Sequence, residues 1–209
     1  MAMSPEDKAA WLSARCGKLT ASRMADAMDV LKNGQPSAKR TQYMRELLAE
    51  RLTGQSMPHF VNEAMIWGTE HEDEAVNVFV ERTGRTVHLS RFYEHPVIQN
   101  FGATPDREID DGLLEVKCPT TATFVDWTIS GQIPDIYKKQ MTAQLLCAGK
   151  PWCGFLAYDP RIKSERKQLF MRKFVPTAEE SHAVFSAAVG FLDELDQMFD
   201  AFVSQPEPA

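Results

Sequence analysis

The chain contains 209 residues, of which 44% are hydrophobic and 25% are charged, and its formal net charge is −6 at pH 7. A chain of this length and composition is able to bury one sizeable core and does not require a second domain. It has no run of about 18 apolar residues, and its start, Met-Ala-Met-Ser-Pro-Glu-Asp, lacks the basic and apolar regions of a signal peptide, so we expect a cytoplasmic protein without a membrane span.

The cysteines do not form a recognisable framework. The sequence contains no CxxC pair and no cysteine with a histidine at the spacing of a zinc site, the four cysteines being Cys16, Cys118, Cys147 and Cys153. This pattern predicts reduced thiols instead of disulfides or a structural zinc site.

Helices are predicted to lead the chain. Ser4-Pro5-Glu6 is typical of a capped helix start, and Ser37 opens a second helix that runs toward Gly54. Residues 55 to 62 are predicted to form a loop. The segment 67–84 has the pattern of an amphipathic helix that a glycine ends. Its inward-facing positions are Ala75, Val76, Phe79 and Val80.

Glu72 differs from the other acidic residues near the start of this third helix. The positive end of the helix dipole explains Glu70, Asp73 and Glu74. Glu72, however, precedes Ala75 by about one turn and lies on nearly the same face. A carboxylate directed toward the core needs a partner, so we expect Glu72 to meet the hairpin described next as an outer ligand for a metal ion.

A β-hairpin is predicted around Asp111-Gly112, which is a strong two-residue turn signal between two short strand patterns. With these two residues as the loop, the expected cross-strand pairs are Asp110 with Leu113, Glu108 with Glu115, and Asp106 with Lys117. Cross-strand partners point the same way, so Asp106 is expected to be a diagonal neighbour of Glu115, within shared reach of one cation.

The hairpin has the residue types of a metal-dependent phosphodiester site. Magnesium prefers carboxylate, carbonyl and water oxygens, which Asp106, Glu115 and the backbone carbonyl of Val116 supply. Lys117 places a positive charge where negative charge develops in the transition state. The alternative is that Asp106 is an ordinary turn residue and that Glu115 and Lys117 lie on a solvated strand face.

The remaining elements predict an α/β fold in which helices flank a mixed β-sheet. Strands are expected at residues 86–95, 99–106, 113–118, 152–158 and 168–174. A helix is expected from about Pro134 to Ala148, closed by Gly149. Thr177-Ala-Glu-Glu180 is a capping box that opens a final helix at about 178–203, whose wide apolar stripe favours packing against the core.

A basic segment reconciles a negative net charge with binding of a phosphate backbone. Residues 161–173 contain six cations and one acid, whereas the chain beyond them is strongly acidic. Exposed charges more than about 10 Å apart are screened, so a local basic surface beside an acidic metal site is able to contact DNA. A solvated loop between two strands is the equally open alternative.

Asp106, the Glu115-Val116-Lys117 triplet and the upstream Glu72 resemble the signature of the PD-(D/E)xK nuclease superfamily. From about residue 11 to about residue 174 the chain resembles, more narrowly, the phage lambda exonuclease type of viral recombinase, also called the YqaJ family. The resemblance implies a restriction-endonuclease-like core in a single nuclease domain spanning 1–209. The N-terminal helices at 5–53 would contribute to the site for the DNA end.

The resemblance also assigns site residues beyond the hairpin. Trp11, Arg15 and Ser22 match the N-terminal motif of the family, in which arginine and serine would hold the terminal 5′-phosphate and tryptophan would contact the terminal nucleotide. Thr104 takes the place of a small hydroxyl residue that touches the same phosphate. Gln144 resembles the active-site glutamine, although the sequence leaves open that Gln144 and Gln140, on one helix face, are surface residues.

The activity implied is that of a 5′-to-3′ exonuclease on linear double-stranded DNA with two Mg²⁺ ions, for which Mn²⁺ would substitute. Asp106 would bind both ions, Glu115 and the Val116 carbonyl one, and Glu72 the other, while Lys117 and Gln144 would position the water. Family relatives assemble as ring-shaped trimers, and a phage-type single-strand annealing protein would take up the 3′ overhang. The alternatives are a structure-specific endonuclease of the same superfamily and a non-catalytic DNA-end or recombination adaptor.

Overall fold

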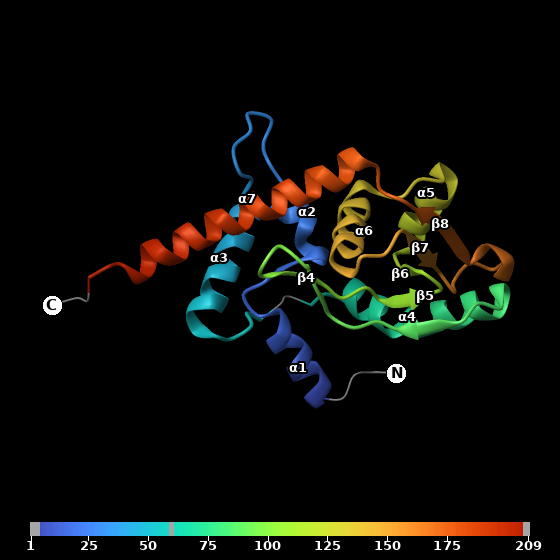
Figure 1. Ribbon diagram of the computed structural model, residues 1–209. Coiled ribbons are helices and arrows are strands. Elements are labelled where there is room, and N and C mark those ends of the chain that lie inside the picture. The colour runs from blue at the N-terminus through green and yellow to red at the C-terminus, as the bar shows by residue number, and fades with distance from the viewer. Residues whose placement is uncertain (1–4, 59–60, 207–209) are drawn as a thin grey trace.

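The computed structural model describes residues 5–58 and 61–206 and consists of helices packed around two β-sheets (Figure 1). The helices are α1 (Pro5–Arg15), α2 (Met24–Ala27), α3 (Ala38–Thr53), α4 (Glu63–Thr83), α5 (Thr121–Ser130), α6 (Asp135–Ala148) and α7 (Ala178–Val203). The strands are β1 (Leu19–Thr20), β2 (Val87–Leu89), β3 (Tyr93–Glu94), β4 (Phe101–Ala103), β5 (Arg107–Ile109), β6 (Gly112–Lys117), β7 (Cys153–Tyr158) and β8 (Leu169–Phe174). Two 3-10 turns lie at Ala21–Arg23 and Glu165–Lys167.

Capping residues set the helix ends where the sequence indicates. The side chain of Ser37 accepts a hydrogen bond from the first turn of α3, and Gly54 closes that helix in the left-handed conformation at φ 67°. Thr177 and Glu180 form the predicted capping box of α7. The predictions for Ser4 and for part of the expected loop at 55–62 fall outside the described residues.

The larger sheet is mixed, as the sequence predicts. Its strand order is β2-β5-β6-β7-β8, with β6 and β7 parallel and every other pair antiparallel. A separate three-stranded sheet has the order β1-β4-β3. The single strand expected at 86–95 is therefore divided, because β2 joins the larger sheet and β3 the smaller one.

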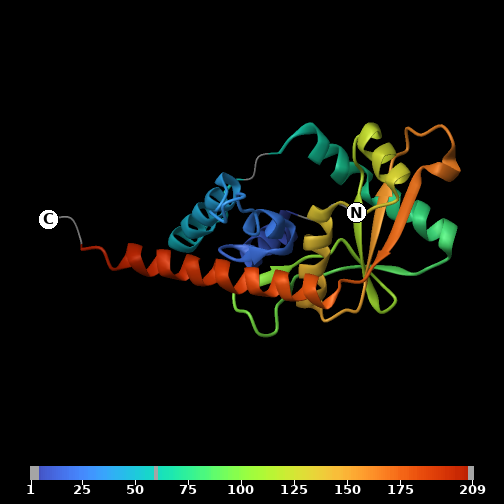
Figure 2. The same ribbon diagram turned by 90° about the horizontal axis from the view of Figure 1, so that it is seen from above.

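Helices cover both faces of the larger sheet (Figures 1 and 2). One face packs against α4, in a cluster that includes Ala75, Val76, Phe79, Leu114, Val116, Leu156 and Tyr158. The opposite face packs against α5 and α6, in a cluster that includes Leu113, Phe124, Met141, Leu145, Phe155 and Phe170. Because side chains alternate along a strand, the odd-numbered residues of β6 face α6 and the even-numbered ones face α4.

The smaller sheet packs with α2, α3, α6 and α7 in a third cluster. The guanidinium of Arg40 joins α3 to α7 through two hydrogen bonds of 2.7 Å to Glu194. The apolar stripe of α7 is buried as far as Leu195, whereas Met198 and Phe202 are exposed where the helix extends away from the rest of the molecule (Figure 2). None of the helices in the described ranges is long and apolar enough to cross a membrane.

The predicted hairpin is present, but its turn lies one residue earlier than predicted, so each cross-strand partner is displaced by two residues. The turn residues are Asp110 and Asp111, and the observed pairs are Ile109 with Gly112, Glu108 with Leu113, and Arg107 with Leu114. Asp110 takes the left-handed conformation at φ 51° that the sequence assigned to glycine. Glu108 is consequently not opposite Glu115, and it accepts a hydrogen bond from the hydroxyl of Tyr93 instead.

Trp152 accounts for the register. A Cβ atom at Gly112 would lie 2.3 Å from the Trp152 ring, so this strand position requires glycine for close approach and not for its turn conformation. The indole Nε1 also donates a 2.7 Å hydrogen bond to Asp111. The ring therefore holds Gly112 in the strand and Asp111 in the loop.

The close contact with Trp152 yields a stability prediction. Gly112→Ala should lower the free energy of unfolding by about 1–3 kcal/mol, the usual cost of overpacking. Gly190→Ala is the matched control, because a Cβ atom there has nothing within 4 Å and the position lies inside α7. It should raise the free energy of unfolding by about 0.5–1 kcal/mol. Denaturant titration of both variants measures the difference, and equal stabilities would contradict the assigned packing.

Candidate active site

The site is built around a carboxylate buried at the end of the central strand β6. Glu115 has no exposed surface and faces α6. Gln140 Nε2 donates to its Oε1 at 2.6 Å, and Gln144 Nε2 donates to its Oε2 at 2.5 Å. Lys117, two residues along the same strand face, forms an ion pair with the same Oε1. The charge of Glu115 is thus surrounded by one cation and two amides.

Asp106 lies next to Glu115, between β4 and β5. Its Oδ2 accepts a 2.7 Å hydrogen bond from the backbone N–H of Val116, which fixes it beside β6. Burial and the negative charges of Glu115 and Glu72 raise the pKa of Asp106 to about 8, although Lys117 acts in the opposite direction. The carboxyl groups of Asp106, Glu115 and Glu72 therefore bring together more negative charge than the single positive charge of Lys117 neutralises.

Lys117 is held as a cation. Burial opposes its charged form, but the carboxylates of Glu115 and Asp106 raise the pKa of Lys117 above its usual value. Its Nζ also lies 5.4 Å from the centre of the Tyr137 ring. A lysine that stays protonated stabilises developing negative charge and does not remove a proton from water as a base.

Glu72 reaches the same pocket from helix α4. It lies on α4, its side chain is 31% exposed, and its Oε1 accepts a 2.6 Å hydrogen bond from Arg107 Nη1. The sequence predicts that Glu72 approaches the hairpin, and the structure places it there. The arginine that binds it was not anticipated from the sequence.

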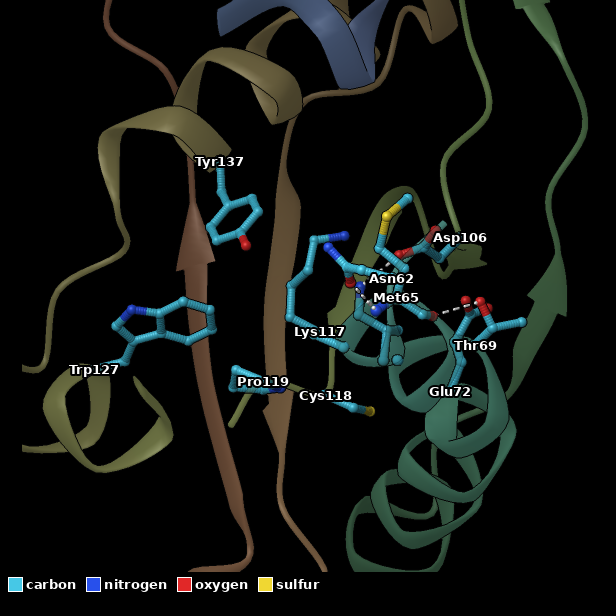
Figure 3. A pocket seen from close by; sticks show the side chains of 13 residues that line it. Asn62, Met65, Thr69, Glu72, Asp106, Lys117, Cys118, Pro119, Trp127 and Tyr137 are labelled. Atoms are coloured by element: carbon cyan, nitrogen blue, oxygen red, sulfur yellow. Dashed lines mark hydrogen bonds between the residues drawn. The ribbon is translucent and has the colours of Figure 1, made fainter. Parts of the chain in front are cut away.

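Glu72, Asp106 and Lys117 line an open pocket of about 450 Å³, and Glu115 lies buried behind Lys117. Figure 3 shows Tyr137 and Trp127 on one side of Lys117, and Asp106, Thr69 and Glu72 on the other. Val116 and Pro119 also line it. The pocket thus has an acidic wall and an aromatic wall, with a lysine between them.

The donor set fits a hard divalent cation. In the described part of the chain, no group of three or more Asp, Glu, His or Cys side chains is gathered to hold a metal ion in this conformation. Magnesium needs fewer protein ligands, because it keeps several waters and usually takes one or two carboxylates together with substrate phosphate. Asp106 and Glu115, on either side of the Val116 backbone, supply that number. Burial, together with the neighbouring carboxylates of Glu115 and Glu72, raises the pKa of Asp106, so a cation bound here would favour its ionised form.

The four residues expected at the DNA end also come together. Thr104 Oγ1 accepts hydrogen bonds from Trp11 Nε1 at 3.1 Å and from Arg15 Nη1 at 3.4 Å. Arg15 Nη2 donates to Ser22 Oγ at 3.4 Å, and its guanidinium lies 4.2 Å from the centre of the Trp11 ring. Residues from α1, the turn after β1 and the segment after β4 thereby form one group.

This group borders a second pocket of about 580 Å³, which Trp11, Arg15 and Ser22 line. Met65, half-exposed at the start of α4, lines both pockets, so they adjoin. Thr104 and Asp106 are two residues apart, a span of at most about 7 Å. A cationic and hydroxyl-rich pocket therefore lies beside the acidic one.

Two functional contacts were missed from the sequence. Gln140 and Gln144 are one helical turn apart, and the sequence assigned a role only to Gln144. The structure shows that both contact Glu115, with Gln144 fully buried and Gln140 half-buried. The i, i+4 spacing was the available signal. For Arg107 the sequence held no signal, because its contacts with Glu72 and Asp73 depend on how α4 packs on the sheet.

Half of the basic segment contacts the protein itself. Arg161 donates to Asp159 and to the carbonyl of Pro119, Arg172 donates to the carbonyl of Gly131, and Lys173 lies 4.7 Å from the centre of the Trp152 ring. These three side chains therefore stabilise the fold through contacts within the protein. Lys163, Arg166 and Lys167 remain candidates for DNA contact.

All four cysteines are free thiols, as expected. Burial raises the pKa of Cys118 and of Cys147 to about 12, and it also raises the pKa of Cys153. Thiols with such pKa values are poor nucleophiles near neutral pH.

Comparisons with known proteins show which family and which solved structures the chain is similar to. The family model of the YqaJ-like viral recombinase domain matches residues 10–151. The crystal structure of LHK-Exo in complex with dAMP is 36% identical, covers 93% of this chain and 95% of its own, and superposes with a TM-score of 0.85. The alkaline exonuclease LHK-Exo from Laribacter hongkongensis gives the same identity and coverage with a TM-score of 0.84. Curated proteins give no match.

A more distant structure supports the fold. The phage related exonuclease from Haemophilus somnus 129PT is 12% identical, covers 88% of this chain and 96% of its own, and has a TM-score of 0.67. At this identity the likeness concerns the fold alone. Together with the close match to LHK-Exo, it confirms the expected restriction-endonuclease-like core.

The pKa of Asp106 yields a prediction for metal-free protein. Folding raises this pKa from 3.8 to about 8, so the folded state binds the proton more tightly, and the associated stability is lost as the pH rises from about 4 through about 8. Asp106→Asn removes the charge and keeps an oxygen that accepts from Val116. In EDTA at pH 9 this variant should unfold at a higher temperature than wild type, and the two should converge at pH 5.

The same melting experiment reports on the cation. Added Mg²⁺ or Mn²⁺ should raise the unfolding temperature of wild type at pH 8 through binding to the folded state, and it should do so far less for Asp106→Asn. A wild-type protein whose unfolding temperature follows that of Asp106→Asn across this pH range, with and without metal, would contradict the carboxylate cluster.

Proposed function

The chain belongs to the YqaJ-like viral recombinase family, and we propose that it is a metal-dependent exonuclease that digests one strand of linear double-stranded DNA from its 5′ end. The observation that carries the proposal is the adjacency of two pockets. The first is lined by the carboxylates of Asp106 and Glu72 and by the protonated Lys117, which is paired with the buried Glu115. The second is lined by Arg15 and Ser22, and Thr104 contacts this arginine. The first suits phosphodiester hydrolysis and the second suits a terminal phosphate.

The acidic pocket would hold two Mg²⁺ ions, for which Mn²⁺ would substitute. Asp106 would bind both ions, Glu115 and the backbone carbonyl of Val116 would bind one, and Glu72 would bind the other. Such ions, when bound, lower the pKa of water and stabilise the entering and leaving oxygens. The residues that support this assignment lie around one pocket, and their oxygens are of the kind that Mg²⁺ prefers.

Side chains around Glu115 would stabilise charge during the reaction and hold Glu115 in place. Lys117, held as a cation, would stabilise the negative charge that develops on the scissile phosphate. Gln144 would hold one oxygen of Glu115 from the buried side, which is a positioning role in support of Lys117. Gln140, at the half-buried edge, would hold the other oxygen and face the substrate.

The second pocket would receive the end of the cut strand. Arg15 and Ser22 would bind the 5′-phosphate, Thr104 would contact the same group, and Trp11 would meet the terminal nucleotide. A guanidinium pairs with phosphate through two hydrogen bonds, and hydroxyl groups complete such a site. Because Thr104 and Asp106 are two residues apart, the bound terminal phosphate and the bond to be cleaved would be separated by about one nucleotide.

The biological setting proposed here rests on the family likeness. The enzyme would work in the cytoplasm of a bacterium, as a phage or prophage product, and would leave 3′ overhangs for a phage-type single-strand annealing protein. A homotrimer whose central channel admits duplex DNA is part of the same proposal. The chain as a whole would form one nuclease domain, with α1 to α3 supplying the DNA-end pocket.

Digestion of defined DNA ends tests the activity. Wild type should release nucleotides from linear duplex with 5′-phosphate faster than from duplex with 5′-hydroxyl, and only with Mg²⁺ or Mn²⁺. Lys117→Ala should lower the rate by at least about 100-fold, in the range found when a transition-state charge partner is removed. Arg15→Gln should reduce the preference for 5′-phosphate while metal dependence is kept. Equal rates for wild type and Lys117→Ala on both ends would refute the proposal.

The same assay separates the two alternatives. Cleavage of closed circular DNA would identify a structure-specific endonuclease, since a circle offers no 5′ end. Binding of DNA ends without metal-dependent release of nucleotides would identify a non-catalytic adaptor. Asp106→Asn is the control in both arms, because it should abolish release without removing the DNA-end pocket.

A further inference from the structure

Arg107 occupies a central place in the site that the proposed chemistry does not use. It follows Asp106 directly, and its side chain is 10% exposed on the α4 face of the larger sheet. Nη1 donates to Glu72 Oε1 and to the backbone carbonyl of Asp106, each at 2.6 Å. Nη2 donates to Asp73 Oδ1 at 2.6 Å. One guanidinium therefore connects α4 to the backbone of Asp106 at the acidic wall of the pocket.

The anchoring of this guanidinium is asymmetric. The guanidinium is also held by the carbonyl of Asp106 and the carboxylate of Asp73. The backbone of Arg107 is fixed because β5 pairs with both β2 and β6. Within residues 5–58 and 61–206, the contact that holds the Glu72 carboxylate is the one from Arg107 to its Oε1. Arg107 is thus the rigid partner, and Glu72, which is three times as exposed, is the one that it orients.

We propose that Arg107 is a positioning residue that presents Glu72 as a one-oxygen ligand to the second divalent cation of the site. Its hydrogen bond engages Oε1 and leaves Oε2 for the ion on the pocket side. This inference rests on the proposed function, because it assumes that the acidic pocket takes two cations.

A guanidinium suits this role better than an ammonium. Its planar donors bind Glu72, Asp73 and a carbonyl at the same time in fixed directions, whereas lysine offers a compact point charge on a flexible stem. Partners that orient metal ligands in this way typically contribute 10–100-fold to metal affinity. The alternative is that Arg107 competes with the cation for Glu72, in which case its removal would strengthen cation binding.

A second alternative is that Arg107 serves only to brace α4 against β5. Asp73 provides the matched control for this structural role. It binds the same guanidinium but lies outside the metal pocket and is half-exposed. Asp73→Asn weakens the brace and leaves the hydrogen bond from Arg107 to Glu72 in place. A structural brace and an oriented ligand therefore predict different results for this variant.

Direct binding of Mn²⁺, followed by electron paramagnetic resonance, tests the proposal without relying on activity. All variants are made in the Lys117→Ala background and mixed with 5′-phosphorylated duplex, so that the DNA is bound but not cut. The parent should bind two Mn²⁺ ions per chain. Arg107→Gln should weaken the second ion by about 10–100-fold and leave the first within about threefold. Asp73→Asn should match the parent for both ions.

Two further variants complete the test. Arg107→Lys keeps the charge without the planar donors, and it should also weaken the second ion by about tenfold. In a Glu72→Gln background, Arg107→Gln should have no additional effect. Unfolding temperatures measured in EDTA identify any variant that fails to fold. If Arg107→Gln fails to fold, Arg107→Lys, which keeps a cation beside two carboxylates, is compared with the parent instead.

The possible failures are distinguishable. A parent that binds fewer than two ions overturns the two-cation site and therefore the proposed function. A parent with two ions whose second affinity is unchanged or stronger in Arg107→Gln, or unchanged in Arg107→Lys, overturns the inference alone. An equal loss in Asp73→Asn and Arg107→Gln would assign Arg107 to the brace.

Discussion

The burial of the Glu115 carboxylate is the constraint on which the rest of the site depends. An ionised carboxylate without exposed surface is strongly unfavourable unless cations and hydrogen-bond donors surround it. The chain meets this requirement with Lys117 from the same strand and with Gln140 and Gln144 from α6. Those contacts fix the position of α6 over the larger sheet. The active-site arrangement is therefore also part of the core, and its geometry is set by folding before any ligand arrives.

The same constraint explains how an acidic chain is suited to act on DNA. Negative charge is concentrated at Asp106, Glu115 and Glu72, where the proposed divalent cations would offset it. The guanidinium of Arg15 lies in the adjoining pocket. The phosphate backbone thus meets positive charge along the proposed path even though the net charge of the chain is −6. Local charge, and not the total, governs the interaction at physiological ionic strength.

Sequence patterns predicted the elements with strong local signals and missed those set by distant contacts. The capping residues Ser37 and Thr177 and the glycine stops placed α3 and α7 within a residue or two, and the order of strands in the second half predicted the mixed sheet. The hairpin register was wrong because the ring of Trp152, 40 residues beyond Gly112, decides which residues turn. The short elements β1, α2 and α5 carry too few periodic positions to be recognised.

The residues of the site also divide into those with a local sequence signal and those placed by distant contacts. The structure brings Asp106, Lys117 and Glu72 around one pocket, with Glu115 paired to Lys117, as the motif predicted. It also gathers Trp11, Arg15, Ser22 and Thr104 into one group beside that pocket. Arg107 was not predicted, because its contacts with Glu72 and Asp73 depend on how α4 packs on the sheet, which no local pattern indicates. The most direct test of the account is an anomalous difference map from a crystal soaked in Mn²⁺. The account predicts two peaks, with Asp106 shared by both, Glu115 and the Val116 carbonyl on one, and Glu72 on the other. An empty pocket, or ions bound elsewhere, would contradict it.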